Sequence, residues 1–246
     1  MLTAAGFPRA TGIAATNQRI YLGSATDIWR LDNILEPNQI EGRRHDRLFV
    51  PRQAHVSGDI NIHELCVEAS GRLIFTATSH SCLATLGAGN GFHPLWQPKF
   101  ISQLVPEDRC HLNGLAIEDG RVRYVTACSA SDSRAGWHAQ RSAAGVLIDV
   151  VTDELIAEGL LLPHSPRVAG DAIYVLESGR AALVRLDRGS GRREDVMLCP
   201  GIARGLAFTG DYALLTISVL RDSDSGMHPL ISRCGDAWQR LGAGCW

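Results

Sequence analysis

The chain has 246 residues, a length at which a single all-β barrel or propeller domain can form. Its 24 basic and 26 acidic side chains give a formal net charge of -2, which excludes a general electrostatic attraction to nucleic acid or to an anionic membrane surface. The sequence has no secretion-signal pattern and no apolar run near the roughly 18 residues of a membrane span, so we expect a cytoplasmic protein with no membrane and no nucleic-acid partner.

Five segments along the chain repeat one pattern, a short apolar strand, a polar turn and a second strand rich in β-branched and aromatic residues. In chain order they are TGIAATNQRIYLGSA from Thr11, IHELCVEASGRLIFTAT from Ile62, HLNGLAIEDGRVRYVTA from His111, HSPRVAGDAIYVLES from His164 and RGLAFTGDYALLTIS from Arg204. Turns such as Asp119-Gly120 and Gly210-Asp211 contain residues that tolerate the positive φ of tight hairpins. Each unit is therefore predicted to open with a β-hairpin.

Further strands follow the hairpins, at residues 28–31, 81–86, 145–150 and 182–187. The units begin roughly 40 to 53 residues apart, which is typical of propeller blades with four strands each. Long amphipathic helical periodicity is absent, and the best helical candidate, residues 153–160, is too short to outweigh the strands. The sequence predicts an all-β fold: a β-propeller of about five visible four-stranded blades, forming a single domain over residues 1–246.

Several strings of this sequence resemble a conserved hypothetical bacterial family that has no established activity. The strings lie between about Phe49 and Ser218 and read HVSGDINIHEL, SCLATL, PEDRCHLNGLA, RYVTA, PHSPR and RGLAF. The resemblance implies a propeller-like fold, related in outline to the gluconolactonase, regucalcin and strictosidine-synthase group. Because members of the family extend further at the C-terminus, we expect a six-bladed type that is shortened here, with the sixth blade missing or completed from another chain.

Histidines recur near the start of three units. In a propeller, the innermost strand of each blade lines the central channel, and aligning the units places His63, His111 and His164 in register, with Arg204 in the fifth unit. Three imidazoles are a ligand set for zinc or another borderline divalent metal, with a fourth position left for water or substrate. The sequence therefore predicts a divalent-metal site, with zinc the preferred ion, at His63, His111 and His164.

Other polar residues near these histidines are candidate catalytic residues: Asp59, Asn113, Arg167 and Arg204. Strand alternation would place Asp59 and Asn61 on the same face as His63, toward the channel. Glu64 would then point away, which makes Asp59 the better acid or metal carboxylate. Asn113 would position the substrate, and the two arginines would bind an anion. The sequence contains no GxSxG, HExxH or Walker A motif.

The same residues also have purely structural interpretations. A single histidine is more often a hydrogen-bonded core residue than a metal ligand. Arg167 and Arg204 could pair with acidic residues such as Glu177 between blades, and Asn113 could mark a bulge. A polar channel could also be filled with ordered water and hold no ligand.

Three classes of function remain open at this level. The first is a metal-assisted lyase or hydrolase of a small polar or anionic substrate in the channel. The second is a non-catalytic propeller that binds a small molecule or a protein on the face formed by its long loops, which contain Phe92, Trp96 and Trp137. The third is a structural member of a larger assembly. Convergence of the histidines would favour the enzyme, and a large apolar patch on the loop face would favour a partner.

Overall fold

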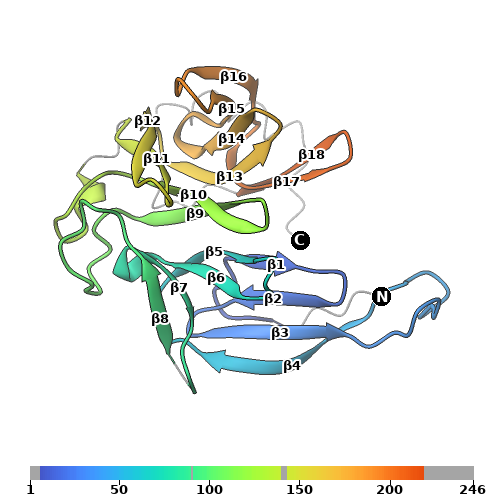
Figure 1. Ribbon diagram of the computed structural model, residues 1–246. Helices are drawn as coiled ribbons and strands as arrows, with labels where there is room; N and C mark the ends of the chain where they lie inside the picture. The colour runs from blue at the N-terminus through green and yellow to red at the C-terminus, as the bar shows by residue number, and fades with distance from the viewer. Residues whose placement is uncertain (1–5, 90, 140–142, 219–246) are drawn as a thin grey trace.

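The computed structural model describes residues 6–89, 91–139 and 143–218. Its strands form antiparallel sheets that follow one another in chain order, four of them with four strands and the last with two (Figure 1). The inner strand of each sheet contacts the inner strand of the next. The sheets are therefore successive blades, and the all-β propeller prediction is confirmed for this part of the chain.

The blades are built as follows. The first contains β1 (Ile13–Ala15), β2 (Arg19–Gly23), β3 (Asp27–Asn33) and β4 (Phe49–Val56), and the second contains β5 (Ile62–Val67), β6 (Leu73–Ala77), β7 (Cys82–Leu86) and β8 (Phe92–Trp96). The third contains β9 (Leu112–Glu118), β10 (Arg121–Ala127), β11 (Gly145–Asp149) and β12 (Glu154–Leu160), and the fourth contains β13 (Pro163–Ala169), β14 (Ala172–Glu177), β15 (Ala182–Asp187) and β16 (Arg193–Leu198). The fifth has β17 (Ile202–Thr209) and β18 (Tyr212–Ser218).

The predicted fifth blade is only partly described, because its expected third and fourth strands, and any sixth blade, would lie after Ser218 and outside the described residues. Helix is limited here to three short 3-10 turns: η1 (Thr78–His80), η2 (Gly136–His138) and η3 (Ser178–Arg180). In the described part of the chain, no helix is long and apolar enough to cross a membrane.

The hairpin turn between β9 and β10 shows how the sequence fixes the shape of a blade. Asp119 and Gly120 have φ values of 49° and 75°, the left-handed conformation that the Asp-Gly pair predicts. Gly120 also accepts a backbone hydrogen bond of 2.8 Å from Ala69 in the hairpin of the second blade. A Cβ atom at Gly120 would lie 2.6 Å from that of Ala69, so a glycine is required where the two blades meet.

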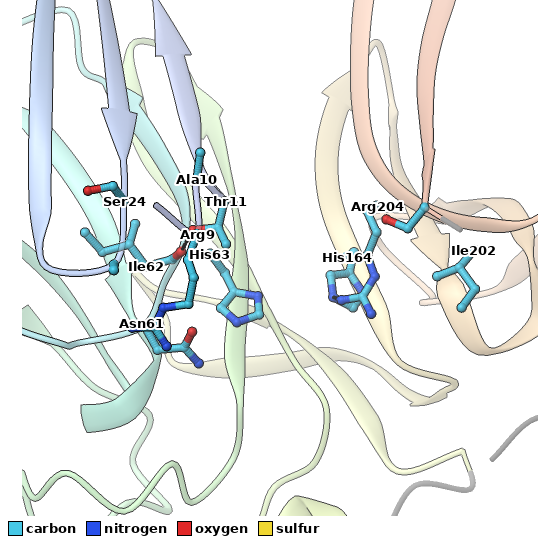
Figure 2. A pocket seen from close by; sticks show the side chains of 12 residues that line it. Arg9, Ala10, Thr11, Ser24, Asn61, Ile62, His63, His164, Ile202 and Arg204 are labelled. Carbon is cyan, nitrogen blue, oxygen red and sulfur yellow. Dashed lines mark hydrogen bonds between the residues drawn. The ribbon is translucent and has the colours of Figure 1, made fainter. Parts of the chain in front are cut away.

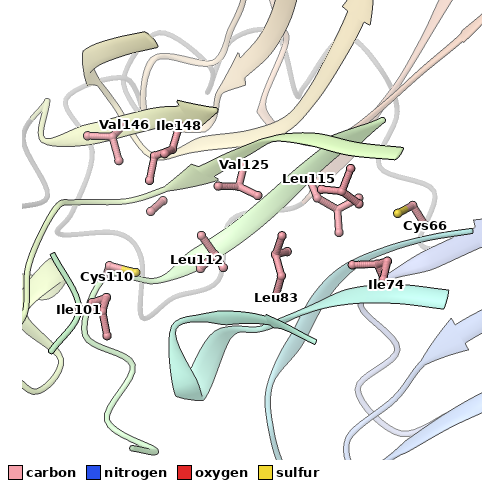
Figure 3. Packing of buried hydrophobic residues seen from close by; sticks show 12 residues of the cluster. Cys66, Ile74, Leu83, Ile101, Cys110, Leu112, Leu115, Val125, Val146 and Ile148 are labelled. Carbon is pink, nitrogen blue, oxygen red and sulfur yellow. The ribbon is translucent and has the colours of Figure 1, made fainter. Parts of the chain in front are cut away.

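Apolar side chains fill the spaces between neighbouring blades. Between the second and third blades, residues from both sheets form one buried cluster (Figure 3), which includes Ile74, Leu83, Leu112, Leu115, Val125 and Ile148. Cysteines belong to these cores, and burial raises the pKa of the thiols of Cys66, Cys82 and Cys110 to about 12. The inner strands are thereby fixed against each other, with their first residues at the centre of the propeller.

Candidate functional site

The inner strands of three blades begin after the same unusual backbone conformation. The residue directly before β5, β9 and β13 is Asn61, His111 and Leu162, with φ values of 54°, 53° and 49°. Positive φ is uncommon outside glycine, and it is strained for a bulky residue such as leucine. Its recurrence at equivalent points shows that these three blades enter their inner strands through the same left-handed turn.

This turn corrects the predicted register of the histidines. His63 and His164 are the second residues of β5 and β13, and the second residue of β9 is Asn113. His111 instead occupies the left-handed position before β9. The common register predicted for the three histidines is therefore wrong for His111, by two residues, because matching the letters of the repeats does not reveal where a strand begins.

The three imidazoles nevertheless lie close together. The ring centroid of His63 is 4.7 Å from that of His111, edge to face, and 6.5 Å from that of His164. His63 is thus the common neighbour of the two other rings. Side chains from the second, third and fourth blades therefore meet at this place.

His164 is held by hydrogen bonds at both ring nitrogens. Its Nδ1 lies 2.9 Å from the carbonyl oxygen of Leu162 and 3.0 Å from the hydroxyl of Ser178. Its Nε2 lies 3.1 Å from a guanidinium nitrogen of Arg204 and 3.4 Å from the amide nitrogen of Asn113. Because arginine can only donate, Nε2 accepts and Nδ1 carries the proton. Burial, and then the charge of Arg204, lower the pKa of His164 to about 3, so the ring is neutral.

His63 is also a neutral ring under ordinary conditions. Burial is the largest cause that lowers its pKa well below the usual value, followed by electrostatic interactions with His111, His164 and Arg204. The side chain is half-buried and lines a pocket. A neutral imidazole at such a place can accept a proton from a bound molecule.

The pocket, which we call the channel pocket, has a volume of about 530 Å³. It is lined by residues of the first, second, fourth and fifth blades, and in Figure 2 Asn61 and His63 face His164 and Arg204 across it. Among the described residues that line it, Arg9 and Arg204 are cationic and none is a carboxylate. Because Arg9 is paired with the Asp59 carboxylate at 2.9 Å, Arg204 is the lining cation that would favour a negatively charged ligand.

Asp59 is not brought into the channel pocket. Its carboxylate pairs with Arg9 at 2.9 Å, and the two side chains are 59% and 62% exposed. The alternation that would have placed Asp59 beside His63 does not apply, because the strand begins only at Ile62, after the left-handed Asn61. The described part of the channel pocket thus lacks the acid that the sequence suggested.

Arg167 is a link between blades. Its guanidinium pairs with the Glu64 carboxylate and donates to the carbonyl oxygens of Leu115, at 3.1 Å, and Pro166, at 2.7 Å. Glu64 also accepts a 2.9 Å bond from the backbone N–H of Leu115. Glu64 points away from the channel, as predicted. Arg167 pairs with an acidic residue of another blade, as its structural interpretation expected, but the partner is Glu64 and not Glu177.

Two residues of the site were not predicted from the sequence. Asp108 accepts hydrogen bonds at one carboxylate oxygen from Nδ1 of His111, at 2.7 Å, and from the indole N–H of Trp137, at 3.1 Å. The Trp137 ring also stacks on His111, with centroids 4.0 Å apart. The only indication of this role in the sequence was the position of Asp108, three residues before His111 in the string DRCH.

The other loop aromatics contact the molecule itself. Trp96 packs against the core between the second and third blades and donates to Asp153 at 2.6 Å. Phe92 packs edge to face on His80, with centroids 4.9 Å apart. A protein partner on the loop face stays a prediction.

In their present arrangement, the side chains of the three histidines do not form a zinc site. Within the described residues, no group of three or more His, Cys, Asp or Glu side chains is arranged to hold a metal ion. Both nitrogens of His164 contact protein groups, and one of these is the cationic Arg204. Zinc would require three nitrogens directed at one point about 2 Å away. The zinc prediction therefore stays a prediction, which metal analysis can test.

These features define a β-propeller with a pocket at its centre that is rich in arginine and neutral histidine. The chain belongs to the DUF4915 family, a domain of unknown function, whose model matches residues 2–234. No curated protein matches the chain in sequence. The resemblance to a conserved family without established activity is confirmed.

Solved structures support the propeller fold. A structure described as a gluconolactonase superposes with a TM-score of 0.53 at 11% identity, covering 82% of this chain and 69% of that one. Virginiamycin B lyase from Staphylococcus aureus superposes with a TM-score of 0.50 at 12% identity, covering 85% of this chain and 62% of the lyase. The present chain also spans 60% of a streptogramin B lyase, at 16% identity and a TM-score of 0.43, with 83% of this chain covered. At these identities, the likeness to the two structures with TM-scores of 0.53 and 0.50 shows the fold alone.

Proposed function

We propose that this protein is a hydrolase or lyase that binds a small anionic substrate in the channel pocket and uses His63 as a general base. The observation that carries the proposal is the presence of arginines and neutral imidazoles in one pocket without a lining carboxylate among the described residues. Arg204 would bind the anion, and the imidazole of His63 would accept a proton.

Arg204 is the principal anion-binding residue in this proposal. Its guanidinium is oriented by a 3.1 Å hydrogen bond to Nε2 of His164, which is itself fixed by Leu162 and Ser178. A guanidinium group presents several N–H donors in one plane and suits a carboxylate or phosphate. The contact with His164 uses one nitrogen and holds the plane at the pocket wall.

His63 supplies the proton acceptor. In the free protein, the neighbouring Arg204 and the two other histidines contribute to the low pKa of His63. Burial is the larger cause of the low pKa of His63, and an anion bound beside Arg204 would offset the electrostatic part and so raise this pKa. His63 would take a proton from a water molecule in hydrolysis, or from a carbon next to the substrate carboxylate in elimination. It would then return that proton to the leaving oxygen.

A lactone that carries an acidic or strongly polar group is the first substrate class to test. Two propellers of similar fold are described as a gluconolactonase and a virginiamycin B lyase. Opening a cyclic ester by added water or by elimination begins with proton transfer to a base in either case. The proposal requires no residue beyond those that line the pocket.

The test separates binding from turnover. Isothermal titration calorimetry with malonate and with inorganic phosphate would measure anion binding, and sugar-lactone opening would be followed with a pH indicator. We expect Arg204→Met to lose anion binding and His63→Ala to keep it while losing turnover. The control is Arg185→Met, because Arg185 pairs at 2.9 Å with the exposed Asp171. Unchanged anion binding in Arg204→Met would refute the proposal, and binding without turnover of any lactone would leave a non-catalytic binding protein.

A zinc-dependent enzyme is the second candidate, and the observation in its favour is the grouping of three rings, with centroid distances of 4.7 and 6.5 Å from His63. It requires His164 to exchange Arg204 for a metal ion. Plasma mass spectrometry on untagged protein is the test. Near-stoichiometric zinc that is lost in His63→Ala, His111→Ala and His164→Ala would favour this candidate, and metal content unchanged in all three would reject it.

A further inference from the structure

Behind His63 lies a cluster of three side chains that the channel pocket does not include: Asp108, His111 and Trp137. We propose that Asp108 is a positioning residue that holds His111 in the tautomer with its proton on Nδ1, leaving Nε2 as a second proton acceptor beside His63. The part of this inference that concerns proton transfer rests on the function proposed above. The part that concerns the tautomer does not.

The identity of the donors fixes the tautomer. One oxygen of Asp108 lies 2.7 Å from Nδ1 of His111 and 3.1 Å from the indole nitrogen of Trp137. An indole N–H only donates and an ionised carboxylate only accepts, so the carboxylate oxygen receives both bonds. A neutral imidazole carries a single proton. With that proton on Nδ1, the lone pair is on Nε2.

Stacking fixes the plane of the His111 ring. Trp137 stacks on His111 at 4.0 Å with an angle of 30° between the planes, and His138 stacks on Trp137 at 3.9 Å with the same angle. The indole therefore contacts His111 by its face and Asp108 by its N–H. Ring and carboxylate are held in one orientation, as expected of a second residue that orients a base.

The loop that carries Asp108 is fixed as well. The backbone N–H of Asp108 donates to the carbonyl of Ser79 at 2.8 Å, and the next residue, Arg109, pairs with Glu107 at 2.9 Å and with Asp132 at 2.7 Å. Asp108 and His111 both have positive φ, 45° and 53°. Such a conformation persists in a bulky residue only where the surroundings impose it. These contacts hold the dyad in place around the turn into β9.

The place of the dyad gives it a role in proton transfer. His111 packs edge to face on His63, the proposed base, at 4.7 Å. When His63 accepts a substrate proton on one nitrogen, the proton on its other nitrogen can pass to Nε2 of His111. His111 then becomes an imidazolium ion, whose charge the Asp108 carboxylate stabilises. Transfer in the reverse direction returns the proton to His63, which donates its substrate-side proton to the leaving oxygen, so that both rings are neutral again.

Nuclear magnetic resonance of 15N-labelled protein tests the tautomer without any substrate. Long-range 1H–15N spectra at pH 7.5 distinguish protonated from unprotonated ring nitrogens. We expect His111 of the native protein in the Nδ1–H form, and a shift of its population toward the Nε2–H form in Asp108→Ala. Asp171→Ala is the matched control, since it removes an exposed carboxylate that pairs with Arg185 rather than with His111. An Nε2–H tautomer in the native protein overturns the inference, even if Asp108→Ala does not fold.

Kinetics separate this inference from the proposed function. If lactone turnover is found, Asp108→Ala should lower kcat by roughly 10- to 100-fold, the usual effect of losing an orienting residue, with KM unchanged. A changed tautomer with kcat unaltered would overturn the proton-transfer role. Failure of anion binding in the channel pocket would instead refute the proposed function and leave the tautomer assignment standing.

Discussion

Two arginines on the inner strands of neighbouring blades have the same side chain and different surroundings. Arg167 on β13 pairs with the buried carboxylate of Glu64 and with backbone carbonyls of two blades. Arg204 on β17 contacts the neutral ring of His164 at the wall of the channel pocket. A cation matched by a buried carboxylate contributes to cohesion between blades, whereas Arg204 brings its charge to the wall of the pocket. The neighbouring group, more than the residue type, decides the role.

The largest effect is expected from Glu64→Ala. The substitution leaves the Arg167 guanidinium without its carboxylate and the backbone N–H of Leu115 without its acceptor. Removing one partner of a buried ion pair usually costs about 3–5 kcal/mol of unfolding free energy. Urea denaturation followed by circular dichroism would measure the loss.

Asp171→Ala is the matched control for this prediction. Asp171 also pairs with an arginine, Arg185, at 2.9 Å, but its side chain is 86% exposed. An exposed ion pair contributes about 0–1 kcal/mol. If Glu64→Ala were no more destabilising than Asp171→Ala, the assignment of Glu64 and Arg167 as a link between blades would be wrong.

The next effect is a dependence of stability on pH that comes from the channel histidines. In the folded protein, burial and then Arg204 lower the pKa of His164 to about 3, while in the unfolded chain it has the ordinary value of about 6.5. Between these values the unfolded chain binds more protons, so the free energy of unfolding falls as the pH falls. Between pH 8 and pH 5 the expected loss is about 2 kcal/mol for His164, and His63 adds a loss of the same sign.

Urea denaturation at pH 8, 6.5 and 5 measures this dependence, and His164→Gln removes the contribution of that ring. We expect a smaller loss of stability between pH 8 and pH 5 in the variant than in the native protein. Above pH 5 most carboxylates remain ionised, so they contribute little to the difference. An identical pH dependence in the two proteins would show that His164 is not held neutral by burial.

The sequence predicted the elements that depend on local patterns. The hairpin at Asp119-Gly120 has the turn that its residues favour, and the repeat of short strands gave the blades. The contacts of Arg167 could not be predicted in this way, because its partner Glu64 lies 103 residues earlier, on another blade. Pairing between blades depends on the three-dimensional packing of strands, which no local pattern contains.

The grouping of the histidines was predicted, and its details were not. Aligning the repeats brought His63, His111 and His164 to the centre of the propeller, where the structure places them. The position of His111 before β9 depends on its left-handed conformation, which no local pattern in the sequence marks. Asp59 was assigned to the pocket by alternation from a strand that in fact begins three residues later, at Ile62.

The smallest effect on stability is expected from Arg204→Met. Measuring this variant beside Arg167→Met tests directly whether the two arginines have different roles. Arg204→Met removes the 3.1 Å hydrogen bond to the neutral ring of His164, so its loss should lower the unfolding free energy by about 1 kcal/mol. Arg167→Met leaves the Glu64 carboxylate buried without its cation and should destabilise the fold strongly. Thermal unfolding followed by circular dichroism would rank the two variants.

The same Arg204→Met variant has a second expected effect, on the pKa of His164. Removing the nearby positive charge should raise this pKa above about 3, but burial is the larger cause of the lowering, so the value should stay below the ordinary one near 6.5. Titration of the ring followed by nuclear magnetic resonance measures the shift, with Arg185→Met as the control at a distant surface pair. An unchanged pKa of His164 in Arg204→Met would mean that the arginine does not act on the ring electrostatically. The two arginines would then differ only in how deeply they are buried.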